Sequence, residues 1–182
     1  MSTHQKFKAG ETHGTYVIEG PVTEQDILQM ARALARRRFC RGLPFTGTRE
    51  VFPYLQTLLA DYEHEVFAVV FLDSRYRSIA YRKLFTGTID HVAVPPREVV
   101  KAALVHNAAA VILVHNHPSG DPEPSERDYD LTDELSRALA LVGIRTLDHV
   151  VVATEGCVSL AERGYLQPQA RAVSTSMAVR LS

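Results

Sequence analysis

The stretch AAVILVHNHPSGDPEPSERD, residues 109–128, decides the fold of this chain. Residues 109–114 form a continuous apolar run, which is typical of a short strand buried on both faces. Residues 116–124 are rich in glycine, proline and aspartate and predict a loop. Ser125 then begins a helix that ends at Gly143. The apolar face of this helix consists of Leu131, Leu135, Ala138, Leu139 and Val142.

Further strands and helices alternate on both sides of this stretch. Apolar and β-branched runs predict the strands, and the polar pair Asp73–Ser74 begins a hairpin connection between two of them. Strands that alternate with helices, together with a hairpin, predict an α/β fold with a mixed sheet flanked by helices. The expected strands cover residues 65–72, 78–85 and 145–153, and the expected helices cover residues 48–61 and the segment that starts at Pro95–Pro96.

The sequence divides into three regions. Residues 1–44 are expected to form an N-terminal extension, in which residues 1–14 predict a mobile leader. The glycines and proline of residues 42–47 mark a boundary, after which residues 45–166 form the main domain. Residues 167–182 are rich in alanine, serine and arginine without a clear period, which predicts a flexible tail.

The extension is expected to hold a short strand over residues 15–19 and an amphipathic helix capped by Thr23, with Asp26 three residues further on. An apolar stripe predicts its buried face, and a basic cluster ends it. Two interpretations of that cluster stay open: a phosphate-binding patch, or cations stabilised by the helix dipole, which we favour because no aromatic platform is interleaved. The stripe is Ile27, Met30, Ala31, Leu34 and Ala35, and the cluster is Arg36, Arg37, Arg38 and Arg41.

The composition is that of an ordinary globular protein. The 182 residues are 46% apolar and 23% charged, and a formal net charge of −1 provides no global basic field for nucleic acid. No apolar run is long enough to span a membrane, and the polar start lacks a secretory signal. Two distant cysteines, Cys40 and Cys157, form no disulfide framework and suggest a reducing, cytoplasmic compartment.

Two histidines two residues apart indicate the chemistry. His115 and His117 follow the apolar strand, and a period of two places both imidazoles on one face. Asp128 lies one turn into the next helix, and the loop is long enough to fold that turn back over the strand end. Two histidines and one carboxylate, with a fourth position left for water, are typical of catalytic zinc.

Each of these residues also has an ordinary structural explanation. The two histidines can be unrelated surface residues, and Ser125 with Asp128 is close to a capping box. A capping serine can still face a site with its hydroxyl. The joint spacing, H-x-H-x7-S-x2-D, favours the metal site.

This spacing resembles the JAMM motif of MPN+/JAB metalloproteases, and HNHPSGDPEPS is similar to the RadC-like branch of that superfamily. The resemblance covers residues 45–166. It implies the JAB/MPN fold, related to that of cytidine deaminases, and one zinc ion per chain, bound by His115, His117 and Asp128, that serves hydrolysis of a peptide or isopeptide bond. Further matching strings are EVF at 65–67, LD at 72–73, TGT at 86–88, PRE at 96–98, HNA at 106–108 and LDH at 147–149.

The resemblance also implies two catalytic side chains. Glu65 is the best match for a general base, which would take a proton from water and deliver it to the leaving amine. Glu63, two residues earlier, would share a strand face with Glu65 and stays the alternative. The Ser125 hydroxyl would stabilise the tetrahedral oxyanion.

Three other positions near the motif are interpreted as supporting residues. Asn116 points to the strand face opposite the histidines and is expected to fix the loop. The pair Asp148–His149 can either supply a hydrogen bond behind a metal ligand or be a satisfied structural pair. Cys157 is expected to be a small buried apolar residue, not a nucleophile.

The same residues bear on three competing functions. Longer RadC-like proteins add an N-terminal helix-hairpin-helix-like region, for which residues 1–44 are too short, so only the arginine cluster supports a DNA-repair role. A zinc deaminase requires H-x-E and P-C-x-x-C, which are missing. A non-catalytic MPN scaffold would lack ligands that are present here. The expected partner is a peptide or protein substrate without a membrane, and the apolar faces of residues 66–71 and 102–103 suit either a core or a homodimer contact.

Overall fold

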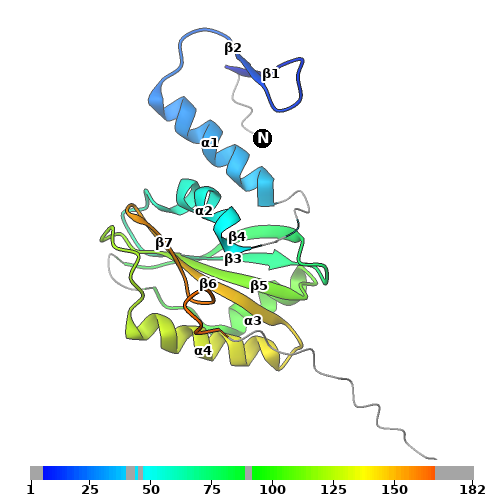
Figure 1. The fold of residues 1–182 in the computed structure, drawn as a ribbon, viewed down its shortest axis with the longest axis vertical. Helices are drawn as coiled ribbons and strands as arrows, with labels where there is room; N and C mark the ends of the chain where they lie inside the picture. Colours follow the sequence, from blue (N-terminus) through cyan, green and yellow to red (C-terminus); the bar gives the residue numbers. More distant parts are fainter. Residues whose placement is uncertain (1–5, 40–43, 45–46, 89–91, 167–182) are drawn as a thin grey trace, which may run out of the picture.

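The computed structural model describes residues 6–39, 44, 47–88 and 92–166. Within them, a five-stranded sheet lies between helices on both faces, and a two-stranded hairpin lies near the N-terminus (Figure 1). The tail predicted for residues 167–182 lies outside the described residues, as do Cys40 and Arg41. No helix of the described part has the length and apolar character needed to cross a membrane.

The main sheet is mixed, as predicted. Its strand order is β4-β3-β5-β6-β7, in which β5 and β6 run parallel and every other neighbouring pair is antiparallel. Parallel neighbours require a crossover, and helix α4 supplies it between β5 and β6. The strands are β3 (Val66–Leu72), β4 (Ser78–Thr86), β5 (Ala110–Asn116), β6 (Arg145–Ala153) and β7 (Gly156–Ser159).

Helices cover both faces of the sheet, which explains why β3 and β5 are apolar without alternation. On one face lie α1 (Glu24–Phe39) and α2 (Phe52–Leu59), and on the other lie α3 (Pro96–Val105) and α4 (Glu126–Ala140) (Figure 1). Even-numbered residues of β5, such as Ile112, pack toward α2, and odd-numbered ones, such as Leu113, pack toward α3 and α4. This alternation decides which side each polar residue at the end of β5 reaches.

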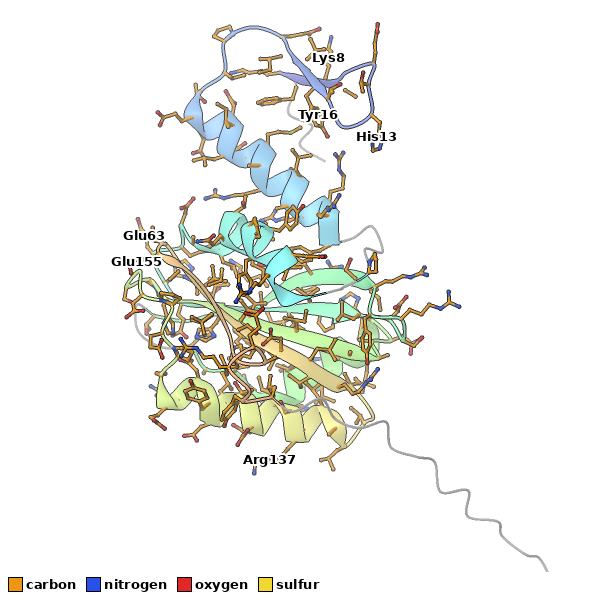
Figure 2. The ribbon with its side chains drawn as sticks, viewed as in Figure 1. Lys8, His13, Tyr16, Glu63, Arg137 and Glu155 are labelled. Carbon is orange, nitrogen blue, oxygen red and sulfur yellow. The ribbon has the colours of Figure 1, made fainter. Side chains whose placement is uncertain are left out.

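The prediction of a mobile leader over residues 1–14 is wrong for Phe7–Ala9. This segment is strand β1, which pairs antiparallel with β2 (Tyr16–Ile18), and Figure 2 shows Lys8 and Tyr16 on this hairpin. Lys8 forms an ion pair with Glu19 at 2.7 Å. The strand has only three residues and no buried side chain, so it lacks the hydrophobic pattern that would have predicted it.

Helix α1 begins as predicted but is not buried along its whole stripe. Thr23 and Asp26 bond reciprocally, with Thr23 N donating at 2.9 Å and Asp26 N donating back at 3.2 Å. Only Ala35 and Phe39 are buried in this helix, and Ile27 is 52% exposed. The reason is that α1 meets the domain through its C-terminal end, while its first turns stand with the hairpin away from the sheet (Figure 1).

Two further expectations for this region were resolved by the structure. The helix predicted over residues 48–61 is a 3-10 turn, Thr48–Val51, followed by α2, because Pro53 is accepted only in a first helical turn. Within the arginine cluster, the Arg38 guanidinium lies 5.7 Å from the centre of the Tyr54 ring, and Arg37 donates a hydrogen bond to the Tyr16 hydroxyl. These two cations therefore make contacts within the chain.

Candidate metal centre

The structure brings the three predicted ligands together. His115 is the second-last residue of strand β5, His117 is the first residue after that strand, and Asp128 lies in the first turn of α4. His115 Nε2 lies 3.0 Å from His117 Nε2 and 3.0 Å from Asp128 Oδ1, and His117 Nε2 lies 3.4 Å from Asp128 Oδ2. One nitrogen or oxygen atom from each residue falls within 4.8 Å of the others, so these side chains can hold a metal ion.

The loop between the two elements explains this convergence. His117 N donates to Val152 O of β6 at 2.8 Å, which continues the strand and keeps both imidazoles on one face. The chain then turns at Gly120, whose φ of +95° favours glycine, and Gly120 N donates to His117 O at 3.2 Å. The turn returns the chain to the start of α4, beside the strand end.

A capping box places the carboxylate. Ser125 N and Ser125 Oγ each donate to Asp128 Oδ2 at 2.7 Å, and Asp128 N points back to Ser125 Oγ at 3.4 Å. Burial of Asp128 would raise its pKa, but the contacts with His115 and His117 and the hydrogen bond from Ser125 outweigh burial and hold that pKa well below its usual range. The carboxylate is therefore ionised, with Oδ1 beside His115 and the capped Oδ2 beside His117.

His117 is oriented by the loop that follows it. Its Nδ1 lies 3.0 Å from Asp121 O, and because a carbonyl only accepts, Nδ1 carries the hydrogen and the neutral ring presents an unshared pair at Nε2. Burial lowers the pKa of His117, but its hydrogen bonds to Asp128 and to the Asp121 carbonyl, with the charge of Glu65, raise that pKa above the usual value.

His115 is buried and bonded to a second buried histidine. Its Nδ1 lies 2.9 Å from Nε2 of His149, whose Nδ1 lies 2.6 Å from Thr132 Oγ1. Burial and the neighbouring His115 hold the pKa of His149 well below its usual value. Of the two roles left open for Asp148–His149, His149 contacts the candidate ligand His115, whereas Asp148 bonds to Ser159 and the following turn. Thr132 was not identified from the sequence; its only signal is a polar residue on the apolar face of α4.

The chemistry of this donor set fits a cation. The Nε2 atoms of His115 and His117 and the ionised carboxylate of Asp128 converge at 3.0–3.4 Å. Such an arrangement is unfavourable unless a proton or a metal ion lies between the donors. Two histidines and one carboxylate are a ligand set typical of catalytic zinc.

A cleft of about 800 Å³ opens beside these ligands. Both candidate bases line it, but Glu65 is partly buried, while Glu63 is exposed at the edge of the molecule (Figure 2). The main chain of Glu65 is held on both sides, because its N–H donates to Thr88 O and its carbonyl accepts from Gly87 N, each at 2.8 Å. The cleft also contains Ser125, whose hydroxyl donates to Asp128 in this structure.

Asn116 fixes the chain, as its strand face predicted. Its Oδ1 accepts from Val66 N at 2.8 Å, and its Nδ2 donates to His64 O at 3.2 Å and to Tyr62 O at 3.4 Å. One side chain between the two histidines thus holds the segment on both sides of Glu65.

Cys157 does not have the features of a nucleophile. It is half-buried against the core beside α2, and its thiol lies 4.0 Å from Phe52 O. Burial raises the pKa of this thiol to about 11, so it stays protonated at neutral pH.

The sheet, its helices and the His-His-Asp cluster define the class of protein, and comparison with known sequences gives the same result. The chain belongs to the RadC-like JAB domain family, whose family model matches residues 45–165. This confirms the resemblance seen in the sequence and the expected JAB/MPN type of fold.

Several curated relatives carry the name UPF0758 protein, which states no activity. The relative from Vibrio cholerae serotype O1 is 51% identical over 151 residues, covering 83% of this chain and 95% of that protein. Those from Marinomonas sp. (strain MWYL1) and Thioalkalivibrio sulfidiphilus are each 53% identical, over 77% and 78% of this chain. The chain spans only 62% and 63% of the length of these two relatives.

Proposed function

We propose that this chain is a zinc-dependent hydrolase of the JAMM type that cleaves an amide bond, peptide or isopeptide, in a peptide or protein substrate. The observation that supports this most strongly is the convergence of His115, His117 and Asp128 beside a cleft that also contains Glu65. The family indicates the reaction class, and the set of two histidines and one carboxylate indicates the metal.

The proposed chemistry assigns a task to each side chain. His115, His117 and Asp128 would hold one zinc ion, which supplies Lewis acidity that activates water and polarises a carbonyl. Glu65 takes the proton from water and transfers it to the leaving amine. Ser125 turns its hydroxyl from Asp128 toward the substrate and donates to the oxyanion, an interaction worth about 3–4 kcal/mol where one such donor was removed from a protease.

The charge of the cleft favours a protein substrate over DNA. Glu63, Glu65, Asp130 and Glu134 line it together with Asp128, and Arg127 is the only lysine or arginine among the described residues of its wall. Because DNA affinity depends on neutralising phosphates with cations, a polyanion is repelled here. A reducing, cytoplasmic compartment is part of the same proposal.

Metal analysis tests the proposal first. Elemental analysis of protein purified without added metal should give about one zinc per chain, and His117→Ala should lose it. Absence of zinc after purification and after titration would overturn the zinc assignment and favour a scaffold.

Peptide and isopeptide screening of the zinc-loaded protein then tests the activity. Glu65→Gln should abolish cleavage while it retains zinc. Glu63→Gln is the matched control, because it makes the same change two residues away on the cleft wall and should leave cleavage intact. Cleavage that survives Glu65→Gln but not Glu63→Gln would reassign the base.

A further inference from the structure

We propose that Thr132 and His149 are positioning residues that fix the tautomer of His115, so that its Nε2 presents an unshared electron pair to the metal. This inference rests on the proposed metal-binding function of the site. It concerns three buried side chains from three elements, α4, β6 and β5, that are linked by consecutive hydrogen bonds.

The chain of hydrogen bonds has a direction, which Thr132 sets. Thr132 Oγ1 lies 2.5 Å from Asp128 O, and a carbonyl oxygen can only accept. The single hydroxyl hydrogen is therefore used on Asp128 O. Only unshared pairs of Oγ1 remain to face His149 Nδ1 at 2.6 Å, so this nitrogen must carry a hydrogen.

His149 in turn determines which nitrogen of His115 carries the hydrogen. It is completely buried, which favours the neutral imidazole, and a neutral imidazole has one N–H. With the hydrogen on Nδ1, its Nε2 accepts from His115 Nδ1 at 2.9 Å. His115 therefore carries its hydrogen on Nδ1, and its Nε2 is left as an acceptor facing Asp128 and His117.

The same segment of α4 controls two ligands. Asp128 supplies a carboxylate to the cluster with its side chain and, with its main-chain carbonyl, anchors the hydroxyl of Thr132 one turn later. The rings of Phe67 and His149 pack edge to face, with their centres 5.9 Å apart, and this contact restrains the plane of the His149 ring. Outer partners that fix a ligand's tautomer typically change metal affinity 10–100-fold when they are removed.

Zinc affinity, measured by competition with a chromogenic chelator, tests this inference in three variants. Thr132→Val keeps the shape but removes the acceptor, and should weaken zinc binding about 10–100-fold. Thr132→Ser keeps the hydroxyl and should bind zinc like wild type. Thr146→Val is the matched control: its buried hydroxyl has no hydrogen-bond partner among the described residues, so the same isosteric change should leave zinc affinity unaltered. Wild-type affinity in Thr132→Val would overturn the inference, even if that variant unfolds at a lower temperature.

Imidazole ¹⁵N NMR of the metal-free protein gives a second measurement that requires no zinc. We expect Nδ1–H signals for both His115 and His149 in the wild type, and a shift of His115 to Nε2–H in Thr132→Val. Nε2–H on wild-type His115 would overturn the inference while leaving zinc binding to be judged on its own. Conversely, the expected tautomers in a protein that binds no zinc would refute the proposed function but not the role of Thr132 and His149 in fixing the His115 tautomer.

Discussion

Asp148 and His149 are neighbours in β6, but they belong to buried polar networks of opposite design. The Asp148 carboxylate accepts from Ser159 Oγ at 2.6 Å, Ala161 N at 2.9 Å and His149 N at 2.7 Å, all of them in or just after the last two strands. The His149 ring lies on the other sheet face, and its hydrogen bonds run through His115 to the cluster beside the cleft.

The difference lies in where each network ends. The Asp148 network connects β6 to β7 and the turn after it, and so holds the end of the described chain onto the sheet. The His149 network ends at the convergent Nε2 atoms of His115 and His117 and the Asp128 carboxylate, a set of side chains that could hold a metal ion. The first network should therefore be needed for stability and the second for binding, and this comparison can be tested.

The largest effect is expected at Asp128, where the His149 network ends. Asp128→Asn keeps the shape and the helix cap but removes the charge. Zinc binding energies of about 10–16 kcal/mol for four-ligand sites assign roughly 3 kcal/mol to each ligand, so zinc affinity should fall at least about a hundredfold. Chelator competition measures it, with Asp130→Asn, in the same cleft, as the control. Equal losses in both variants would show that only the general charge of the cleft matters.

Asp148→Asn should break the Asp148 network and leave the His149 network intact. Hydrogen bonds to a buried charged group contribute about 1.5–3 kcal/mol each, and an amide cannot accept from all three donors, so the free energy of unfolding should fall by about 2–3 kcal/mol. Urea denaturation measures it, and zinc affinity of the folded variant should stay at the wild-type value. A large loss of zinc affinity without loss of stability would reverse the assignment of the two networks.

A rise in pH from 6 to 8 should lower the stability of the metal-free protein and raise its zinc affinity, both through His117. The pKa of His117 is raised above its usual 6.5, so its contribution to the stability of the metal-free protein is complete below pH 6.5 and is lost as the pH rises through the raised pKa. The metal-free protein should thus melt higher at pH 6 than at pH 8. Zinc must displace that proton, so zinc affinity should rise by up to about tenfold per pH unit over the same range.

Thermal melts at both pH values, with and without zinc, measure these two trends. His117→Gln should remove the difference between pH 6 and pH 8 in the metal-free protein. A metal-free protein that becomes more stable as the pH rises to 8 would contradict the assigned direction.

The smallest effect is expected for Thr146→Val, at the start of β6 and outside both networks. Within the part of the chain that the structure describes, the buried Thr146 hydroxyl has no hydrogen-bond partner, so an apolar replacement of the same shape removes an unsatisfied group. Stability should stay within about 1 kcal/mol of wild type or rise slightly. A clear loss in urea denaturation would show that this hydroxyl does have a partner in solution.

Local patterns in the sequence predicted strands β3 to β6, the helices of the main domain and the three clustered side chains, because each follows from a period or a spacing within one short stretch. Thr132 could not be found in this way, since its role depends on His149, 17 residues away, and on β6 lying parallel to β5. The hairpin strand Phe7–Ala9 was missed because its three residues bury nothing. Features that arise within one helix or strand could be predicted from the sequence, whereas those that depend on contacts between elements could not.

The crossover from β5 through α4 to β6 has a consequence for how this protein can change. Residues 110–153 contain all three clustered side chains and both positioning residues, whereas Glu65 lies before β3, in a different part of the chain. The proposed metal-binding residues and the proposed general base thus lie in separate stretches of the sequence. Under the proposed function, a single substitution at Glu65 would remove proton transfer and leave His115, His117 and Asp128 in place, so loss of catalysis and loss of metal could occur independently.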